Sequence, residues 1–164
     1  MRKRLLPRVP DIVVDDLTGA ATRDLLAFHL AGMHANSPPG SIFALDLSGL
    51  QDPAVTVWTL RDGDAVLGIG ALKTLSADHG EVKSMRTHPD HLRKGVARAM
   101  LEHIIGQAQA RGMTRLSLET GTGPAFDAAL TMYRQRGFIE GEPFADYVGG
   151  SGFNRFFHLD LATA

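Results

Sequence analysis

Residues 54–75 constrain the fold of this chain more than any other stretch. Two runs rich in apolar and β-branched residues are joined there by Arg-Asp-Gly-Asp. Asp-Gly between two such runs is a strong hairpin signal, because a tight hairpin turn needs residues that tolerate positive φ. The main sheet is therefore predicted to begin with an antiparallel pair. The run at 80–88 has the length and partial alternation of a third strand.

After residue 88 the pattern alternates between helix and strand. We expect a helix at 95–111, a strand at 115–119, a helix at 124–136, a strand at 137–141 and a last strand at 155–161. Upstream of the hairpin we expect a strand at 11–17, a helix at 22–35 and a proline-glycine loop, and a short helix stays open within 41–53. An antiparallel start followed by such units predicts an α/β fold with one mixed sheet and helices packed on it.

The helix at 95–111 has the clearest signal. Its apolar residues recur at the i, i+3, i+4, i+7 spacing of one buried face. They are Ala97, Met100, Leu101, Ile104, Ile105 and Ala108. Gly112 and Gly137 follow this helix and the next one, at the positions where left-handed caps belong.

The size and charge of the chain narrow the classes of function. A chain of 164 residues with 44% hydrophobic residues suits a single domain, spanning 1–164. A formal net charge of -1 gives no reason to expect nucleic acid or a membrane surface as partner. The apolar runs are too short for a signal peptide or a transmembrane helix, so we expect a cytoplasmic protein. The oligomeric state stays open, a homodimer included.

Metal and thiolate chemistry are not expected. The sequence contains no cysteine, which leaves no thiolate ligand or nucleophile. His79, His88 and His91 come close together in the chain, but no His-Glu-x-x-His pattern accompanies them. We therefore predict no metal site.

The stretch HPDHLRKGVARAML, residues 88–101, predicts an anion site. Arg93, Lys94 and Gly95 stand where the free N–H groups of the following helix point outward, and Arg98 lies one turn further. Cations at a helix N-terminus oppose the macrodipole, so an anionic partner such as a phosphate or pyrophosphate accounts for them better than a solvated turn. The glycine would let that partner approach the backbone without a Cβ in the way.

Two motifs give the chain a resemblance to a known family. The first is Leu92-Arg93-Lys94-Gly95-Val96-Ala97, and the second is Ala129, Tyr133, Gly137 and Phe138 at the spacing Ala-x-x-x-Tyr-x-x-x-Gly-Phe. Together with the order of elements over residues 55–161, they resemble the GCN5-related N-acetyltransferase (GNAT) superfamily. The resemblance implies a mixed, mostly antiparallel central sheet that is splayed at the cofactor site, with helices on both faces. Leu92 and Phe126 depart from the family, which usually has Arg or Gln and Asn there.

The resemblance also implies that the chain uses acetyl-CoA. The pyrophosphate would lie on the backbone of residues 93–98, and the pantetheine arm would pair with the strand edge near Met85 and Thr87. The cofactor-binding residues expected on this basis are Met85, Arg86, Thr87, Arg93, Lys94, Gly95, Val96, Ala97, Arg98, Phe126 and Tyr133.

Proton transfer would fall to Tyr133 and Glu81. Tyr133 occupies the family's general-acid position, and a phenol is protonated at neutral pH. The alternative for it is a buried core tyrosine. Glu81 stands six residues before Thr87, where several family members carry the general base. The alternatives are that Glu81 is an exposed carboxylate at a strand end, or that water, Glu119 or His34 takes the proton.

The acceptor is expected to be a small amine such as a free amino acid. The stretches LETG at 118–121 and PFADY at 143–147 look most like bacterial small-substrate members of the superfamily. Residues 33–41 and 143–154 would wall the acceptor site. The contacts expected there come from His34, Asn36, Glu119 and Tyr147. Two alternatives stay open: a protein or peptide N-acetyltransferase, and a non-catalytic acyl-CoA-binding domain, which Leu92 and Phe126 would favour.

Overall fold

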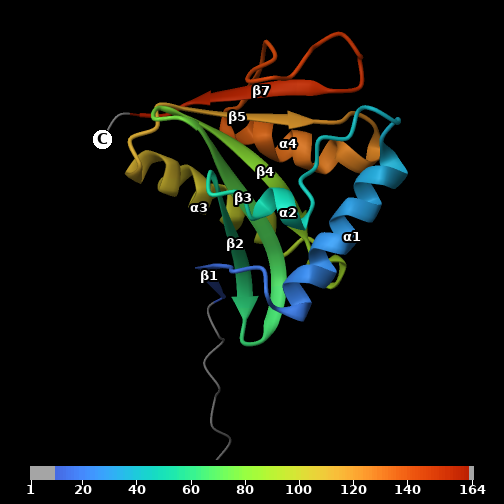
Figure 1. Ribbon diagram of the computed structural model, residues 1–164, viewed down its shortest axis with the longest axis vertical. Coiled ribbons are helices and arrows are strands. Elements are labelled where there is room, and N and C mark those ends of the chain that lie inside the picture. Colours follow the sequence, from blue (N-terminus) through green and yellow to red (C-terminus); the bar gives the residue numbers. More distant parts are fainter. Residues whose placement is uncertain (1–9, 163–164) are drawn as a thin grey trace, which may run out of the picture.

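The computed structural model describes residues 10–162, which form a seven-stranded sheet with helices packed on it (Figure 1). The strands are β1 Asp11–Val14, β2 Val55–Asp62, β3 Ala65–Ser76, β4 His79–Thr87, β5 Arg115–Thr120, β6 Ile139–Glu140 and β7 Arg155–Asp160. The helices are α1 Ala20–Asn36, α2 Leu47–Leu50, α3 Val96–Ala110 and α4 Asp127–Arg136, with 3-10 turns η1 Pro89–His91 and η2 Pro124–Phe126. Every predicted element is present within a few residues of its expected bounds.

The sheet has the order β1-β2-β3-β4-β5-β7-β6 and is antiparallel except between β4 and β5. Gly63, at φ 59°, forms the predicted Asp-Gly turn between β2 and β3.

The first strand is shorter than the predicted 11–17 because Asp15 turns inward. Its carboxylate accepts hydrogen bonds from the backbone N–H of Leu17 at 2.7 Å and from Arg61 at 2.8 Å.

Helices cover both faces of the sheet, as predicted. On one face, α3 and α4 pack on the sheet through a core that includes Trp58, Met100 and Ile104. On the other face, α1 and α2 bury Leu25 and Leu50 against the strands. The apolar period of α3 is confirmed, and Gly112 and Gly137 adopt the predicted positive φ of 80° and 107°. Among residues 10–162, no helix is long and apolar enough to cross a membrane.

The sheet opens between β4 and β5. These strands pair only from His79 to Glu81 and from Arg115 to Ser117, after which β4 continues to Thr87 without β5 (Figure 1). On its other side, β4 pairs with β3 and contains a bulge at Ser84, whose φ is 57°. Meanwhile β5 pairs with β7 along its whole length. Each strand keeps one partner, and the gap between them is the predicted splay.

Because α3 packs tightly on β3, we expect a single methyl group added between them to lower the stability of the fold. A Cβ on Gly68 would lie 2.5 Å from Val96 Cγ1 and 3.3 Å from the Arg86 carbonyl oxygen. Because valine is stiff at χ1, Gly68→Ala should lower the free energy of unfolding by about 1–3 kcal/mol. Gly106→Ala is the matched control: its Cβ would meet nothing within 4 Å, so it should raise stability by about 0.5–1 kcal/mol through helix propensity. Denaturant titration measures both, and equal shifts would contradict this packing.

Candidate active site

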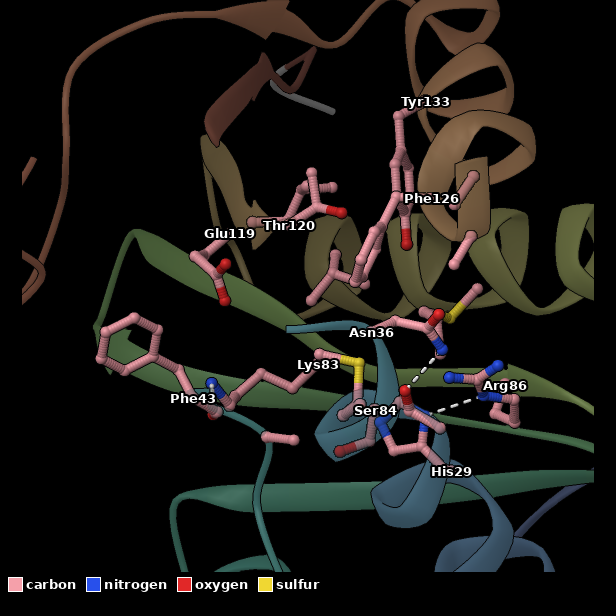
Figure 2. A pocket seen from close by; sticks show the side chains of 18 of the residues that line it. His29, Asn36, Phe43, Lys83, Ser84, Arg86, Glu119, Thr120, Phe126 and Tyr133 are labelled. Carbon is pink, nitrogen blue, oxygen red and sulfur yellow. Dashed lines mark hydrogen bonds between the residues drawn. The ribbon is translucent and has the colours of Figure 1, made fainter. Parts of the chain in front are cut away.

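Many of the predicted site residues line one cavity. It lies where β4 and β5 diverge and is bordered by α1, the segment around Phe43 and the start of α4 (Figure 2). Among its lining residues are Asn36, Glu81, Met85, Arg86, Glu119, Phe126 and Tyr133. These residues come from four separate stretches of the chain, and the divergence of the two strands brings them together.

Glu81 is buried at the point where the strands separate. Its side chain is 4% exposed, so it is not an exposed strand-end carboxylate. Its Oε2 accepts a hydrogen bond from the Tyr147 hydroxyl at 2.5 Å and from Lys83 Nζ at 3.2 Å. Its Oε1 makes no hydrogen bond to residues 10–162 and is not enclosed by them. One carboxylate oxygen is therefore held by two donors, and the other is left to accept.

Lys83 is a site residue that the sequence patterns above do not single out. Its Nζ donates to the Tyr147 hydroxyl at 2.9 Å and to the Phe43 carbonyl oxygen at 3.4 Å, besides pairing with Glu81. The two-residue period of a strand places residues 81 and 83 on one face, which is the signal that could have found it. The hydroxyl of Tyr147, a residue expected to contact the acceptor, donates to Glu81. Burial, with the Glu81 charge, raises the pKa of this phenol, so it stays a donor.

Glu119 is the second carboxylate of the cavity. Burial raises the pKa of its carboxyl group, and the hydrogen bond from Asn154 Nδ2 at 2.8 Å opposes this shift. The same Nδ2 donates to the Ser41 carbonyl oxygen at 3.1 Å. The segments 33–41 and 143–154, predicted to wall the acceptor site, are thus hydrogen-bonded to each other next to Glu119.

Tyr133 is a buried residue of the core that also lines the cavity. Its ring is buried on α4 and packs against Phe138 with ring centroids 5.7 Å apart. Its hydroxyl points into the cavity, as Figure 2 shows, and none of the hydrogen bonds among residues 10–162 includes it. Burial raises the pKa of this phenol, so at neutral pH it carries a proton that it can donate.

On the α1 side of the cavity, Arg86 contacts a histidine that the sequence patterns above do not single out. Arg86 Nε donates to His29 Nδ1 at 2.9 Å (Figure 2). Burial, together with the Arg86 charge, lowers the pKa of His29 to about 4. His29 lies at helical spacing from Gly32, Met33 and Asn36, which also line the cavity. His34 does not join them; it faces a separate hollow beside Pro39 and Asp46.

The predicted anion loop has an open backbone at the start of α3. Gly95 is the N-cap with φ 79°, and Arg93 also has a positive φ of 61°. The first hydrogen bond of the helix runs from Ala99 N to Gly95 O at 3.0 Å, so the N–H groups of residues 96–98 precede the helical ladder. A Cβ on Gly95 would meet nothing within 4 Å, which leaves this face open to a ligand.

Side chains around this loop are divided between the core and solvent. Val96 is buried under Gly68, so it can contact a ligand only through its backbone. Arg93 and Lys94 are exposed, and Arg98 donates to Gln135 Oε1 at 3.3 Å. Among residues 10–162, no three His, Asp or Glu side chains come together as metal ligands. The loop therefore offers backbone donors and exposed cations, which is the donor set that a pyrophosphate needs.

Comparison with known sequences identifies related proteins over most of the chain. A model of the acetyltransferase (GNAT) family matches residues 23–138. The N-acetyltransferase YedL of Escherichia coli is 52% identical over 136 residues, which is 83% of this chain and 86% of that protein. The N-acetyltransferase YsnE of Bacillus subtilis is also 52% identical over 136 residues, 83% of this chain and 90% of that protein. The resemblance predicted from the two motifs is confirmed.

Solved structures share the fold. A Klebsiella pneumoniae protein described as an acyl-CoA N-acyltransferase has a TM-score of 0.78 at 24% identity, covering 94% of this chain and 99% of that one. A Bacillus subtilis acetyltransferase in complex with CoA has a TM-score of 0.68 at 18% identity, covering 94% and 100%. A shorter sequence match, 34% identical over 70 residues, covers 43% of this chain and 46% of the [ribosomal protein bS18]-alanine N-acetyltransferase of Escherichia coli.

The buried His29 predicts a specific dependence of stability on pH. The pKa of His29 is about 4 in the folded chain, against 6.5 for an ordinary histidine, so below pH 6.5 the unfolded chain binds the proton more readily. This group therefore stabilises the fold above pH 6.5, and its contribution of up to about 3 kcal/mol is lost as the pH falls toward 4. His29→Gln should make the loss of stability between pH 7 and pH 5 shallower in denaturant titrations. The exposed His34→Gln should keep the original slope, and identical slopes for all three proteins would contradict the burial of His29.

Proposed function

The chain belongs to the acetyltransferase (GNAT) family, and we propose that it transfers the acetyl group of acetyl-CoA to the amine of a small molecule such as an amino acid. The observation that carries this proposal is the divergence of β4 and β5 beyond Glu81. It opens onto a cavity in which a buried carboxylate and the Tyr133 hydroxyl are both accessible. We further propose that residues 1–164 act as one domain.

Acetyl-CoA would supply the acetyl group as an activated thioester. Its pyrophosphate would be held by the N–H groups at the start of α3, with Arg93, Lys94 and Arg98 as the nearby cations. Its pantetheine arm would pair with the edge of β4 from Met85 to Thr87, which β5 leaves free. Two features support this fit: the open, positive-φ backbone at Gly95 and the end of β4–β5 pairing at Glu81.

Gly95→Glu should weaken CoA binding strongly, because the substitution places a side chain and a negative charge against the pyrophosphate. Gly95→Ala is the matched control. It adds only a methyl group in open space, so it should bind CoA better than Gly95→Glu does, although its positive φ costs about 1 kcal/mol of stability. Calorimetric titration with CoA measures both. If Gly95→Glu binds CoA as tightly as the unmodified protein, the pyrophosphate does not bind at this loop.

One carboxylate, as base, and one phenol, as acid, would move the protons. The amine must lose a proton before it attacks, and Glu81 Oε1 would accept it directly or through a water molecule. Lys83 and Tyr147 would hold Glu81 in place through its Oε2. Tyr133 would donate its hydroxyl proton to the departing sulfur. Glu119 is a second candidate for the base, because burial raises the pKa of its carboxyl group and so makes the carboxylate a stronger base.

Profiles of kcat/KM against pH distinguish these roles. Tyr133→Phe keeps the packing and removes the proton donor, so it should lower the rate by about 10²–10⁴ with little change in stability. If Glu81 is the base, Glu81→Gln should lose most activity at low pH and recover at high pH, where more of the amine is already neutral. If Glu119 is the base, Glu119→Gln should show this pattern instead. If both Gln variants have profiles parallel to that of the unmodified protein, neither carboxylate is the base and the amine is deprotonated by solvent. If Tyr133→Phe is fully active, Tyr133 is a core residue and not the proton donor.

A protein or peptide acceptor is the second candidate function, since the shorter match includes a ribosomal-protein acetyltransferase. The hydrogen bond between Ser41 and Asn154 favours a small acceptor, because it joins two walls that a polypeptide would have to pass between. A panel of free amines and amino-terminal peptides, assayed for release of CoA, tests the choice. Binding of CoA without turnover on any of them would indicate a non-catalytic domain.

A further inference from the structure

Arg86 is a half-buried cation that has no carboxylate partner among residues 10–162. Its guanidinium lines the cavity, and burial lowers its pKa. Its one side-chain hydrogen bond runs from Nε to a neutral histidine, and none of the ion pairs among residues 10–162 includes it. A cation removed from water needs a compensating anion, and Lys83, on the same strand, has one in Glu81.

Arg86 and His29 both keep N–H groups that can donate, and the Arg86 guanidinium lies over the Phe28 ring with its Cζ 5.8 Å from the ring centroid. Arg86 Nε contacts His29, which leaves the two terminal NH₂ groups free of hydrogen bonds to residues 10–162. Because His29 accepts at Nδ1, its own proton lies on Nε2, and this N–H is a further donor on the cavity wall. Gly32 keeps the site uncovered: a Cβ there would lie 3.4 Å from Arg86 Nη2. Such a set of donors matches a carboxylate, which a guanidinium can bind with two parallel hydrogen bonds.

The cavity has the opposite charge on its other side. Figure 2 shows Glu119 on one side of the cavity and Arg86 and His29 on the other, with the Tyr133 side chain reaching in from the top of the view. The charges of Glu81 and Lys83 both act on Glu119, so this side holds two carboxylates and one cation, and the amine would be deprotonated there. We infer that the acceptor is an amine that also carries a carboxylate, as a free amino acid does, and that Arg86 and His29 bind this carboxylate. This inference rests on the proposed acetyl transfer and makes Arg86 the residue that selects the acceptor.

The test compares acceptors that share a side chain and an amine and differ in whether they carry the carboxylate. Each of a panel of amino acids is assayed beside its amide and its decarboxylated amine. The free acid should have a kcat/KM about 10–100-fold above that of its amide, mostly through KM. In Arg86→Met this ratio should fall to about 1, and Arg86→Lys should retain part of it. Arg115→Met, an exposed arginine on β5, is the matched control and should keep the original ratio.

A binding measurement makes the test independent of turnover and of the variants. Calorimetry on the unmodified protein with CoA present compares an N-acetyl amino acid with its amide, and the acid should bind at least about 10-fold more tightly. Equal binding would overturn the carboxylate site, even if both amines are acetylated. Tighter binding of the acid with no turnover would support the site and contradict acetyl transfer. If Arg86→Met weakens CoA and leaves the acid-to-amide ratio unchanged, the guanidinium serves CoA and the inference is wrong.

Discussion

The pairing of β4 with β5 stops at Glu81 and Ser117, and the candidate site depends on this end point. Strands that part in the middle of a sheet leave backbone groups without partners, which is costly unless each strand is held from its other side. Here β3 holds β4, with a bulge at Ser84, and β7 holds β5 along its length. The opening therefore leaves each strand with one partner, and it presents a free strand edge and a cavity at the same place.

The charges in this cavity are arranged in two different ways. Glu81 is compensated within the chain by Lys83 and by the Tyr147 hydroxyl, which fixes one carboxylate oxygen and leaves the other accessible. Arg86 is supported by His29, which is kept neutral by burial and so supplies no countercharge. The first arrangement suits a group that receives a proton, and the second suits a group that binds an anion.

Much of the fold could be predicted from the sequence because its signals are local. The Asp-Gly turn, the apolar period of α3 and the glycine caps at Gly112 and Gly137 each depend on residues within one or two turns of each other. Two site residues that the motifs did not indicate also lie at local periods, one on β4 and one on α1. Lys83 follows Glu81 at the two-residue period of a strand, and His29 shares the cavity-facing side of α1 with Asn36.

The sequence by itself determined the mixed sheet, the glycine-containing loop at the start of α3 and the positions of Glu81 and Tyr133 in their elements. Only the tertiary structure decided what these residues contact. Tyr147 reaches Glu81 across 66 residues of chain, and His29 reaches Arg86 across 57. Such contacts depend on how loops and helices pack after the sheet has formed. No period in the sequence encodes them, because periodicity relates only residues of the same helix or strand.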